Sequence, residues 1–369
     1  MIDYIFFSII LTSLGVIYKK NSSNSDEVKL VLNLFIVFSV VFLATLMGWR
    51  VISPTQGGID TSVYKYIYEY LIHSNYSSVL DQRLEIGYSS FSWAVKKITD
   101  DFEFFLFLIS LLMLTLYLHI CKYITAGVFS ALGAFYISLF VIDGFNISRM
   151  ILSVFILFFI IPCLNRRKYL YSVGITLLAA SIQMTALWGF VIISYYFVLY
   201  ELTERKETRL IFFFSGLAIS FVMVSVFKAL LVNIGYGHYL NDTSETSYLN
   251  YIFLTVLILL SQIFDLQNKF TGTISETALK VLPTMYYVLP LYAALPIAYR
   301  FNLFYLLIFG LLIPLYCNYG YKRLIQLDVY AISIFLIPLL YFGMKVSKYF
   351  EVNVNSALSW DLATAWYLF

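Results

Sequence analysis

Long apolar runs separated by short polar segments recur along the whole chain. Runs of roughly 17–25 apolar residues match the length that an α-helix needs to cross a bilayer. We place such spans at 4–18, 30–48, 104–121, 126–142, 150–164, 169–182, 185–200, 210–227, 250–264, 283–299, 303–317 and 325–343. The pattern predicts an all-α, polytopic membrane bundle of about twelve transmembrane helices, forming a single domain over residues 1–369. It excludes a β-barrel, whose strands alternate polar and apolar residues.

The longest stretch without a span covers residues 50–103. Gln56-Gly57-Gly58 marks a turn, and Asp60 or Thr61 is placed to cap a helix that starts there. Helical spacing puts one set of apolar and aromatic residues on a single face of this helix: Tyr64, Ile67, Tyr68 and Leu71. A second amphipathic helix, lying along the membrane surface, is indicated by Ile86, Phe91, Val95 and Ile98.

Composition and charge narrow the class of protein. Hydrophobic residues make up 61% of the chain and charged residues only 12%, whereas a soluble domain carries about a quarter charged residues. The net charge of +3 is small, and the basic residues are scattered at the ends of the apolar runs. A nucleic acid is therefore not an expected partner.

The distribution of Lys and Arg predicts an orientation. With the N-terminus outside, the inside loops are those that carry Lys19–Lys20, Lys122, Arg166–Arg167–Lys168, Arg205–Lys206–Arg209 and Lys322–Arg323. Cytoplasmic loops are enriched in these residues. This orientation places the 50–103 loop outside, which in a bacterial inner membrane is the periplasm.

Two acids within that loop are each followed by a tyrosine. Asp60 precedes Tyr64, and Glu85 precedes Tyr88. Carboxylates that bind hydroxyl groups and aromatic rings that stack on sugars are typical of carbohydrate sites. Solvated surface acids would give the same spacing, so both interpretations stand at this point.

Three arginines fall at outside ends of spans. Arg50 ends a span, Arg149 follows Asn146-Ile147-Ser148 at the start of an apolar run, and Arg300 lies between Tyr299 and Phe301. Guanidinium is planar, permanently charged and able to form two parallel hydrogen bonds to phosphate. The three arginines would make a clamp for phosphate groups, although an arginine at a helix end also serves as an interface anchor.

Motifs for nucleotide and metal chemistry are missing from the sequence. It contains no Walker loop, no GxGxxG, no HExxH and no CxxC pair, and the three histidines are isolated. Nucleotide-driven pumping and a zinc site are therefore unsupported. We expect neither a cofactor nor a metal ion.

The order of these elements resembles the EpsG branch of the Wzy-type polysaccharide polymerases. That family shows an arginine, a G-T-D-x-x-x-Y element, an E-P-G-Y element, an Asn-x-x-Arg helix start, a basic loop, a helix ending in His-Ser-Ala and a late Tyr-Arg. Over roughly residues 45–305 the matching positions are Arg50, Gly58-Ile59-Asp60, Tyr64, Glu85-Ile86-Gly87-Tyr88, Asn146 to Arg149, Asn165-Arg166-Arg167-Lys168 and Tyr299-Arg300. The chain departs from the pattern at Ile86, in place of proline, and at Gln183, in place of histidine.

The resemblance implies a helical glycosyltransferase of GT-C-like architecture that works at the periplasmic face of the inner membrane. Its substrates would be oligosaccharide repeat units on undecaprenyl pyrophosphate, and a chain-length regulator and a flippase would be partners. The implied catalytic residues are Asp60, Glu85, Arg149 and Arg300, and the implied substrate-binding residues are Arg50, Tyr64, Tyr88, Gln183 and Tyr299. A glutamine at 183 can hydrogen-bond a sugar or phosphate but cannot act as an imidazole base.

Two other functions fit the hydrophobicity of the chain. A flippase or other transporter of lipid-linked sugars would place many polar residues near the bilayer midplane, whereas this chain concentrates them in one outside loop and at span ends. An O-antigen ligase would use the same lipid-linked donors, but its motifs differ.

Overall fold

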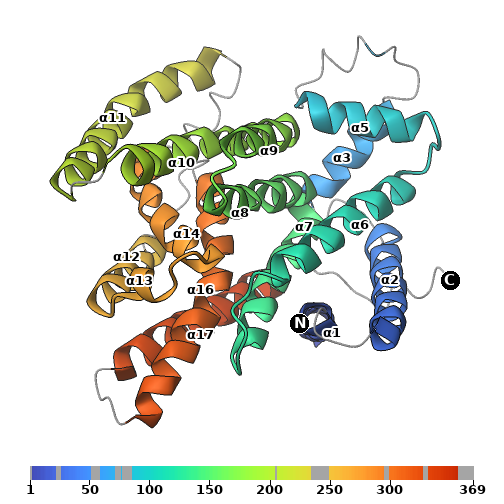
Figure 1. Cartoon of the computed structure of the whole chain (residues 1–369). Coiled ribbons are helices and arrows are strands. Elements are labelled where there is room, and N and C mark those ends of the chain that lie inside the picture. The colour runs from blue at the N-terminus through green and yellow to red at the C-terminus, as the bar shows by residue number, and fades with distance from the viewer. Residues whose placement is uncertain are drawn as a thin grey trace. The chain divides into compact units, whose positions relative to one another are not determined.

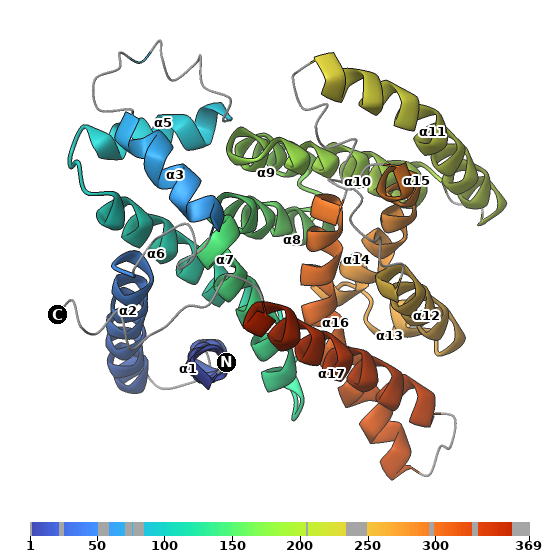
Figure 2. The same cartoon turned by 180° about the vertical axis from the view of Figure 1, so that it is seen from behind.

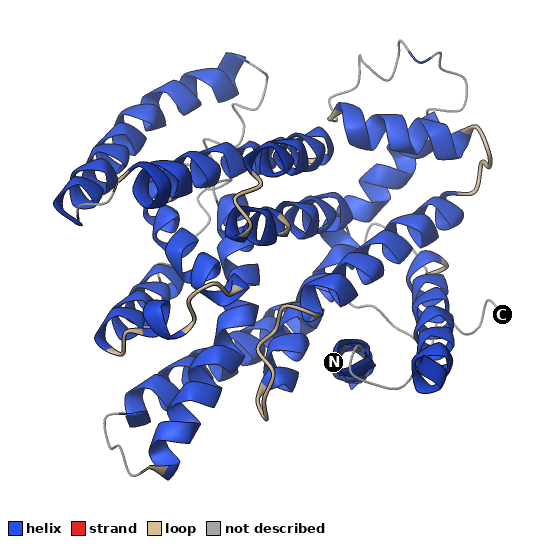
Figure 3. Ribbon diagram, in the orientation of Figure 1, coloured by secondary structure: helices blue, strands red, loops and turns tan. Residues whose placement is uncertain are grey.

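The computed structural model of the chain describes residues 2–21, 26–50, 59–70, 76, 85–203, 206–233, 249–294, 299–326 and 331–355. Every regular element within these ranges is helical, and Figure 3 shows no strand among them. The prediction of an all-α fold is confirmed for the described part of the chain.

The helices are labelled in Figure 1. In chain order they are α1 (Ile2–Asn21), α2 (Asp26–Gly48), α3 (Ile59–Tyr70), α5 (Ile86–Lys96), α6 (Phe102–Cys121), α7 (Ser130–Phe158), α8 (Ile160–Asn165), α9 (Tyr169–Ile182), η2 (Met184–Leu187), α10 (Trp188–Tyr196), η3 (Phe197–Leu202), α11 (Lys206–Asn233), α12 (Leu249–Ile263), α13 (Leu266–Lys269), α14 (Ile274–Val281), η5 (Leu282–Tyr287), α15 (Leu289–Ala294), α16 (Tyr299–Ile325) and α17 (Ala331–Asn355).

Six helical segments among the described residues are long and apolar enough to cross a membrane. They are Asp26–Gly48, Phe102–Cys121, Ser130–Asn165, Met184–Leu202, Thr208–Val226 and Arg300–Ile325. Three shorter apolar helices, Tyr169–Ile182, Tyr251–Ile263 and Ile332–Met344, lie at other predicted spans. The chain is therefore a helical membrane protein, and the count of about twelve spans stays a prediction. The spans predicted at 126–142 and 150–164 both overlap the one segment Ser130–Asn165, in which α7 is broken at Ile147.

The spanning helices differ in how much of their surface other helices cover. The Ser130–Asn165 and Arg300–Ile325 segments have 72% and 78% of their most apolar window buried, whereas Thr208–Val226 has 6%. α2 likewise exposes large apolar side chains, including Val31, Leu34 and Phe38. Exposed apolar stripes of this length suit helices that face lipid, while α7 and α16 are covered by protein.

The chain divides into two compact units. The first contains Met1–Ile156, Leu178–Met184 and Gly310–Phe369, and the second contains Leu157–Leu177 and Thr185–Phe309. Both units are helical in the parts that the structure describes. The single transmembrane domain expected over residues 1–369 stays a prediction.

The first unit anchors the helices of the 50–103 segment on α6. α3 and α5 lie side by side, as Figures 1 and 2 both show, and each contacts α6. The ring of Tyr68 stacks 4.9 Å from that of Phe105, and its hydroxyl donates to the Thr99 carbonyl at 2.9 Å. Lys65 forms an ion pair with Glu103 at 2.9 Å. Among the described residues of this segment, α3 and α5 are thus packed on the rest of the unit.

Both predicted helices of this segment are present, and the start of the first differs from the prediction. α3 begins at Ile59, so Asp60 and Thr61 lie in its first turn rather than before it. Of the residues predicted to share a face, Tyr64 and Tyr68 are buried, and Leu71 lies outside the described residues.

The four residues predicted to share an apolar face do not share one: Ile86 and Val95 differ in burial, and Ile98 lies beyond the end of α5 at Lys96. Ile86 is 53% exposed and Ile98 is 79% exposed, whereas Val95 is buried. The face that packs on α3 and α6 is set by the buried residues Tyr88, Ser89, Ser92, Val95 and Lys96. It is partly polar, so hydrophobicity alone did not locate it.

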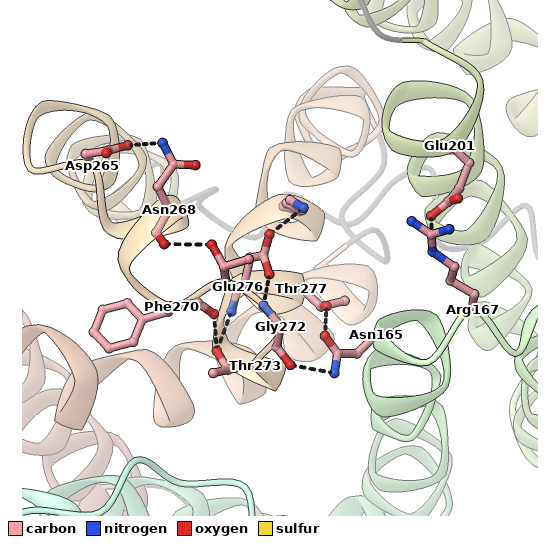
Figure 4. A network of polar contacts seen from close by, with 12 residues as sticks. Asn165, Arg167, Glu201, Asp265, Asn268, Phe270, Gly272, Thr273, Glu276 and Thr277 are labelled. Carbon is pink, nitrogen blue, oxygen red and sulfur yellow. Dashed lines mark hydrogen bonds and ion pairs between the residues drawn. The ribbon is translucent and has the colours of Figure 1, made fainter.

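In the second unit, a buried polar group and a tethered loop fix the ends of short helices. The hydroxyl of Tyr305 accepts from Trp188 Nε1 at 2.7 Å and lies 2.6 Å from the Thr284 hydroxyl. Figure 4 shows Asn165, at the end of α8, bonded to the start of α14: its amide donates to the Gly272 carbonyl at 3.2 Å and accepts from Thr277 at 2.9 Å.

Candidate active site at the interruption of α7

The site begins at a break in α7. Ile147 has φ −107° and ψ 46°, outside the helical range, and no proline lies between Ser130 and Phe158. A break in the hydrogen-bond pattern of a helix leaves backbone carbonyls without their helical donors. A buried carbonyl then needs another partner. The predicted Asn146-Ile147-Ser148-Arg149 element therefore lies at the break, within α7.

Two side chains from outside α7 satisfy the carbonyl that precedes the break. The Phe145 carbonyl accepts from Arg50 Nη2 and from Thr61 Oγ1, each at 2.5 Å. Arg50 also donates through Nη1 to the Met47 carbonyl, and its guanidinium lies 5.0 Å from the centre of the Phe145 ring. Arg50 is only 3% exposed. It joins the ends of α2 and α3 to the break, from inside the unit.

The first turn of α3 is held to the same break. The backbone N–H of Asp60 donates to Asn146 Oδ1 at 2.9 Å. Thr61 is fully buried, while Asp60 is half-buried. The start of α3 is therefore pinned against α7 by adjacent residues of each helix.

Arg149 and Glu85 form an ion pair two residues beyond the break. Arg149 Nη1 donates to Glu85 Oε2 at 2.5 Å, and the two side chains are 13% and 16% exposed. The other carboxylate oxygen, Oε1, accepts from the backbone N–H of Met184 at 2.9 Å. Glu85 lies just before α5, and its side chain does not cap that helix. Its carboxylate instead joins Arg149 to the segment that follows α9.

Two tyrosines pack around the guanidinium. The Arg149 Cζ lies 5.8 Å from the ring centres of both Tyr64 and Tyr88, and the two rings are 5.6 Å apart. Burial raises the pKa of Tyr88 well above its ordinary value, and this outweighs the opposing charge of Arg149. Tyr88 is therefore neutral across the physiological range and cannot serve as a general base.

The C-terminal end of α9 approaches α5 closely at Gly87. A Cβ on Gly87 would lie 2.3 Å from Ser181 Oγ and 2.7 Å from the Ser181 carbonyl oxygen. Gln183, two residues further on, is 5% exposed. The helix end that carries Gln183 thus lies against the Glu85-Ile86-Gly87-Tyr88 element.

The structure brings together seven of the nine predicted site residues in the first unit. They are Arg50, Asp60, Tyr64, Glu85, Tyr88, Arg149 and Gln183. Arg300 is half-buried in the first turn of α16 and belongs to the second unit with Tyr299, whose side chain is not among those described. The functional roles of all nine stay predictions.

Sequence reasoning gave no role to several groups that build this site. Asn146 and Gly87 lay inside elements that were singled out, but only the geometry shows what they contact. The Phe145 carbonyl and the Met184 N–H are main-chain groups, which leave no signal in the identity of a residue. Among the described residues, no group of three or more His, Cys, Asp or Glu could hold a metal ion.

Comparison with known proteins decides the family. The sequence profile of the EpsG family matches residues 33–356, which is most of the chain. The chain belongs to the EpsG family. No curated protein and no solved structure matches it. Family membership confirms the resemblance found in the sequence, and it indicates a membrane protein of the polysaccharide polymerase type with a lipid-linked oligosaccharide as substrate.

Proposed function

We propose that this EpsG-family protein is an O-antigen or exopolysaccharide polymerase. It joins oligosaccharide repeat units that are carried on undecaprenyl pyrophosphate, at the periplasmic face of a bacterial inner membrane. The growing chain is transferred from its carrier to the nonreducing end of a new unit. A GT-C-like helical architecture, a chain-length regulator and a flippase as partners belong to the same proposal.

The state of Arg149 is the observation that carries the proposal. Its guanidinium is nearly enclosed by Glu85, Tyr64 and Tyr88, yet its Nε has no hydrogen-bond partner among the described residues. A buried N–H without an acceptor costs about 1–3 kcal/mol, which an anionic ligand oxygen would offset. Arginine presents several donors in one plane, which suits a pyrophosphate.

The geometry favours Asp60 over Glu85 as general base. Both oxygens of Glu85 are engaged, one by Arg149 and one by the Met184 N–H. With both oxygens occupied by donors, Glu85 is poorly placed to accept the proton of the acceptor hydroxyl. Glu85 then holds Arg149 in place, and Asp60, half-buried in the first turn of α3, takes the proton.

The proposed step is a single displacement at the anomeric carbon of the growing chain. The acceptor hydroxyl oxygen forms a bond to that carbon, and the bond from the carbon to the pyrophosphate oxygen breaks. The electron pair leaves with undecaprenyl pyrophosphate, whose developing charge Arg149 stabilises. The hydroxyl proton passes to Asp60.

The remaining predicted residues have supporting roles in this proposal. The binding roles expected from the sequence for Gln183, and for Arg300 and Tyr299 in the second unit, stay predictions. Tyr64 and Tyr88, at 9% and 3% exposed, are too buried to stack on a sugar, and they keep the guanidinium oriented. Arg50 stabilises the break through its hydrogen bond to the Phe145 carbonyl.

The test is polymerisation by the purified protein in proteoliposomes that contain defined lipid-linked repeat units. We expect a ladder of chain lengths that each differ by one repeat unit, with release of the lipid pyrophosphate. Transfer of finished polymer to a lipid A core, with no chain growth, would identify a ligase instead. Movement of units across the bilayer without bond formation would identify a flippase.

A further inference from the structure

The break in α7 links the two groups that the proposed mechanism uses. Building on the proposed function, we infer that Asn146 is a positioning residue that fixes Asp60 relative to Arg149, and that Thr61 and Arg50 support it. None of the three touches the reacting atoms. Their contribution is to set the geometry of the general base and of the anion-binding arginine.

Asn146 occupies the position from which both groups are controlled. Its Oδ1 accepts from the backbone N–H of Asp60 at 2.9 Å, which anchors the first turn of α3. Arg149 follows three residues later on the other side of Ile147. A shift of Asn146 therefore moves the base through α3 and the arginine through α7 together.

Thr61 and Arg50 hold the break in its open form. The Thr61 hydroxyl has a single proton, which it donates to the Phe145 carbonyl at 2.5 Å, and it accepts from Arg50 Nη2 at 3.3 Å. With both residues buried, the Phe145 carbonyl receives two donors that water does not replace. Without them, that carbonyl would regain a donor by closing the helix, which would displace Asn146.

The chemistry of Asn146 fits this task better than a substrate contact. Its amide oxygen accepts a main-chain hydrogen bond whose donor belongs to a residue 86 positions away in sequence. Thr61 is 0% exposed and Arg50 is 3% exposed, so a polar substrate cannot reach either of them. The side chains of Asn146, Thr61 and Arg50 therefore form hydrogen bonds inside the break rather than with a substrate.

The experiment compares Asn146→Ala with wild type in the full-length protein in proteoliposomes. We expect kcat for chain extension to fall roughly 10- to 100-fold, since a misplacement of about 1 Å can cost a hundredfold. KM for the lipid-linked unit should stay near the wild-type value. Thr61→Val should act in the same direction, and Thr61→Ser, which retains the hydroxyl, should restore the rate.

A matched control separates positioning from general loosening. Asn165 makes two tethering hydrogen bonds of a similar kind in the second unit (Figure 4). Asn165→Ala should lower the temperature of unfolding and leave kcat unchanged. A loss of kcat as large as that of Asn146→Ala would overturn the inference, as would a raised KM with an unchanged kcat in Asn146→Ala.

Hydrogen exchange supplies a readout that does not depend on activity. The Asp60 amide is a donor to Asn146, so peptides that cover Ile59–Tyr70 should exchange faster in Asn146→Ala than in wild type or Asn165→Ala. Unchanged exchange would overturn the positioning role. If exchange differs between Asn146→Ala and wild type as expected, but the wild-type protein makes no polymer, only the proposed function is contradicted.

Discussion

Two long helices are interrupted in opposite ways: α7, nearly all of which lies in the first unit, and α16, whose C-terminal part from Gly310 belongs to that unit. α7 breaks at Ile147 without a proline, whereas α16 contains Pro314 and is assigned as one helix from Tyr299 to Ile325. Proline removes the donor for the carbonyl four residues earlier, here that of Gly310. Around Pro314 the residues Leu311, Leu312, Ile313 and Leu315 are at most 1% exposed. This interruption is enclosed by apolar packing.

The break in α7 has polar neighbours from distant parts of the chain. Arg50 and Thr61 reach the Phe145 carbonyl across 95 and 84 residues of sequence. Satisfying one main-chain group there brings α3 and the end of α2 to α7. A polar interruption can therefore bring the residues of a site together, while an apolar interruption is only surrounded by packed side chains.

The largest effect is expected at the general base next to the polar break. Asp60→Asn should lower kcat for polymerisation roughly 10²- to 10⁴-fold, the range for loss of a general base. Initial rates of chain extension measure this. Asp26→Asn, whose carboxylate is fully exposed at the start of α2, is the control and should keep the wild-type rate. Equal rates for both variants would exclude Asp60 as the base.

The next effect concerns Arg149. Arg149→Ala should reduce the rate roughly 30- to 1,000-fold, which corresponds to about 2–4 kcal/mol of transition-state stabilisation. Arg149→Lys should recover only part of it, because lysine keeps the charge and loses the planar fork.

The matched control for Arg149 is Arg167→Ala. Arg167 also pairs with a glutamate, Glu201 at 3.3 Å, but its side chain is 75% exposed. Surface pairs of this kind contribute at most about 1 kcal/mol, so we expect wild-type activity. If the Arg149→Ala and Arg167→Ala variants both polymerise at the wild-type rate, Arg149 serves only as an interface anchor and not in catalysis.

Two glycine substitutions compare the polar site beside the break with the apolar interruption, each by adding one Cβ atom. Gly87→Ala places its Cβ 2.3 Å from Ser181 Oγ, next to Glu85. Overpacking of this kind costs about 1–3 kcal/mol. We also expect kcat to fall by roughly tenfold, less than the hundredfold of a full 1 Å misplacement, because the shift moves Glu85 away from the Met184 N–H.

The smallest effect on activity is expected at the apolar interruption. Gly133→Ala would place its Cβ 2.6 Å from both the Gly310 carbonyl oxygen and Pro314 Cγ. The free energy of unfolding should fall by a similar amount, about 1–3 kcal/mol, with kcat unchanged. Thermal unfolding in detergent and polymerisation of the same preparations give both values. A loss of kcat in Gly133→Ala equal to that in Gly87→Ala would remove the distinction between the two interruptions.

The sequence predicted the helical class, and it predicted a connection between two spans at the place where the structure has a break within one helix, α7. Apolar periodicity located α3, and the run Asn146-Ile147-Ser148-Arg149 marked where two spans meet. The limit of prediction from apolar periodicity is visible at α5, where Ser89, Ser92 and Lys96 are buried and Ile86 is exposed. Packing on a polar face is decided by the neighbouring helices, which a one-dimensional pattern does not contain.

The pairing within the site could not be predicted for a related reason. Glu85 and Arg149 were both identified as candidates, yet their ion pair joins positions 64 residues apart. The bond from Asn146 to Asp60 has a main-chain donor, so no side-chain type at position 60 reveals it. Long-range contacts of main-chain groups depend on the fold itself.

The bond from Met184 to Glu85 bears on how position 184 can vary during evolution. Only the N–H of Met184 enters the site, and its side chain is 56% exposed. Exchange for almost any amino acid would leave this hydrogen bond intact, so relatives can drift there in size, charge and polarity. Proline alone lacks the N–H. Position 184 should therefore be variable among functional relatives and closed to proline.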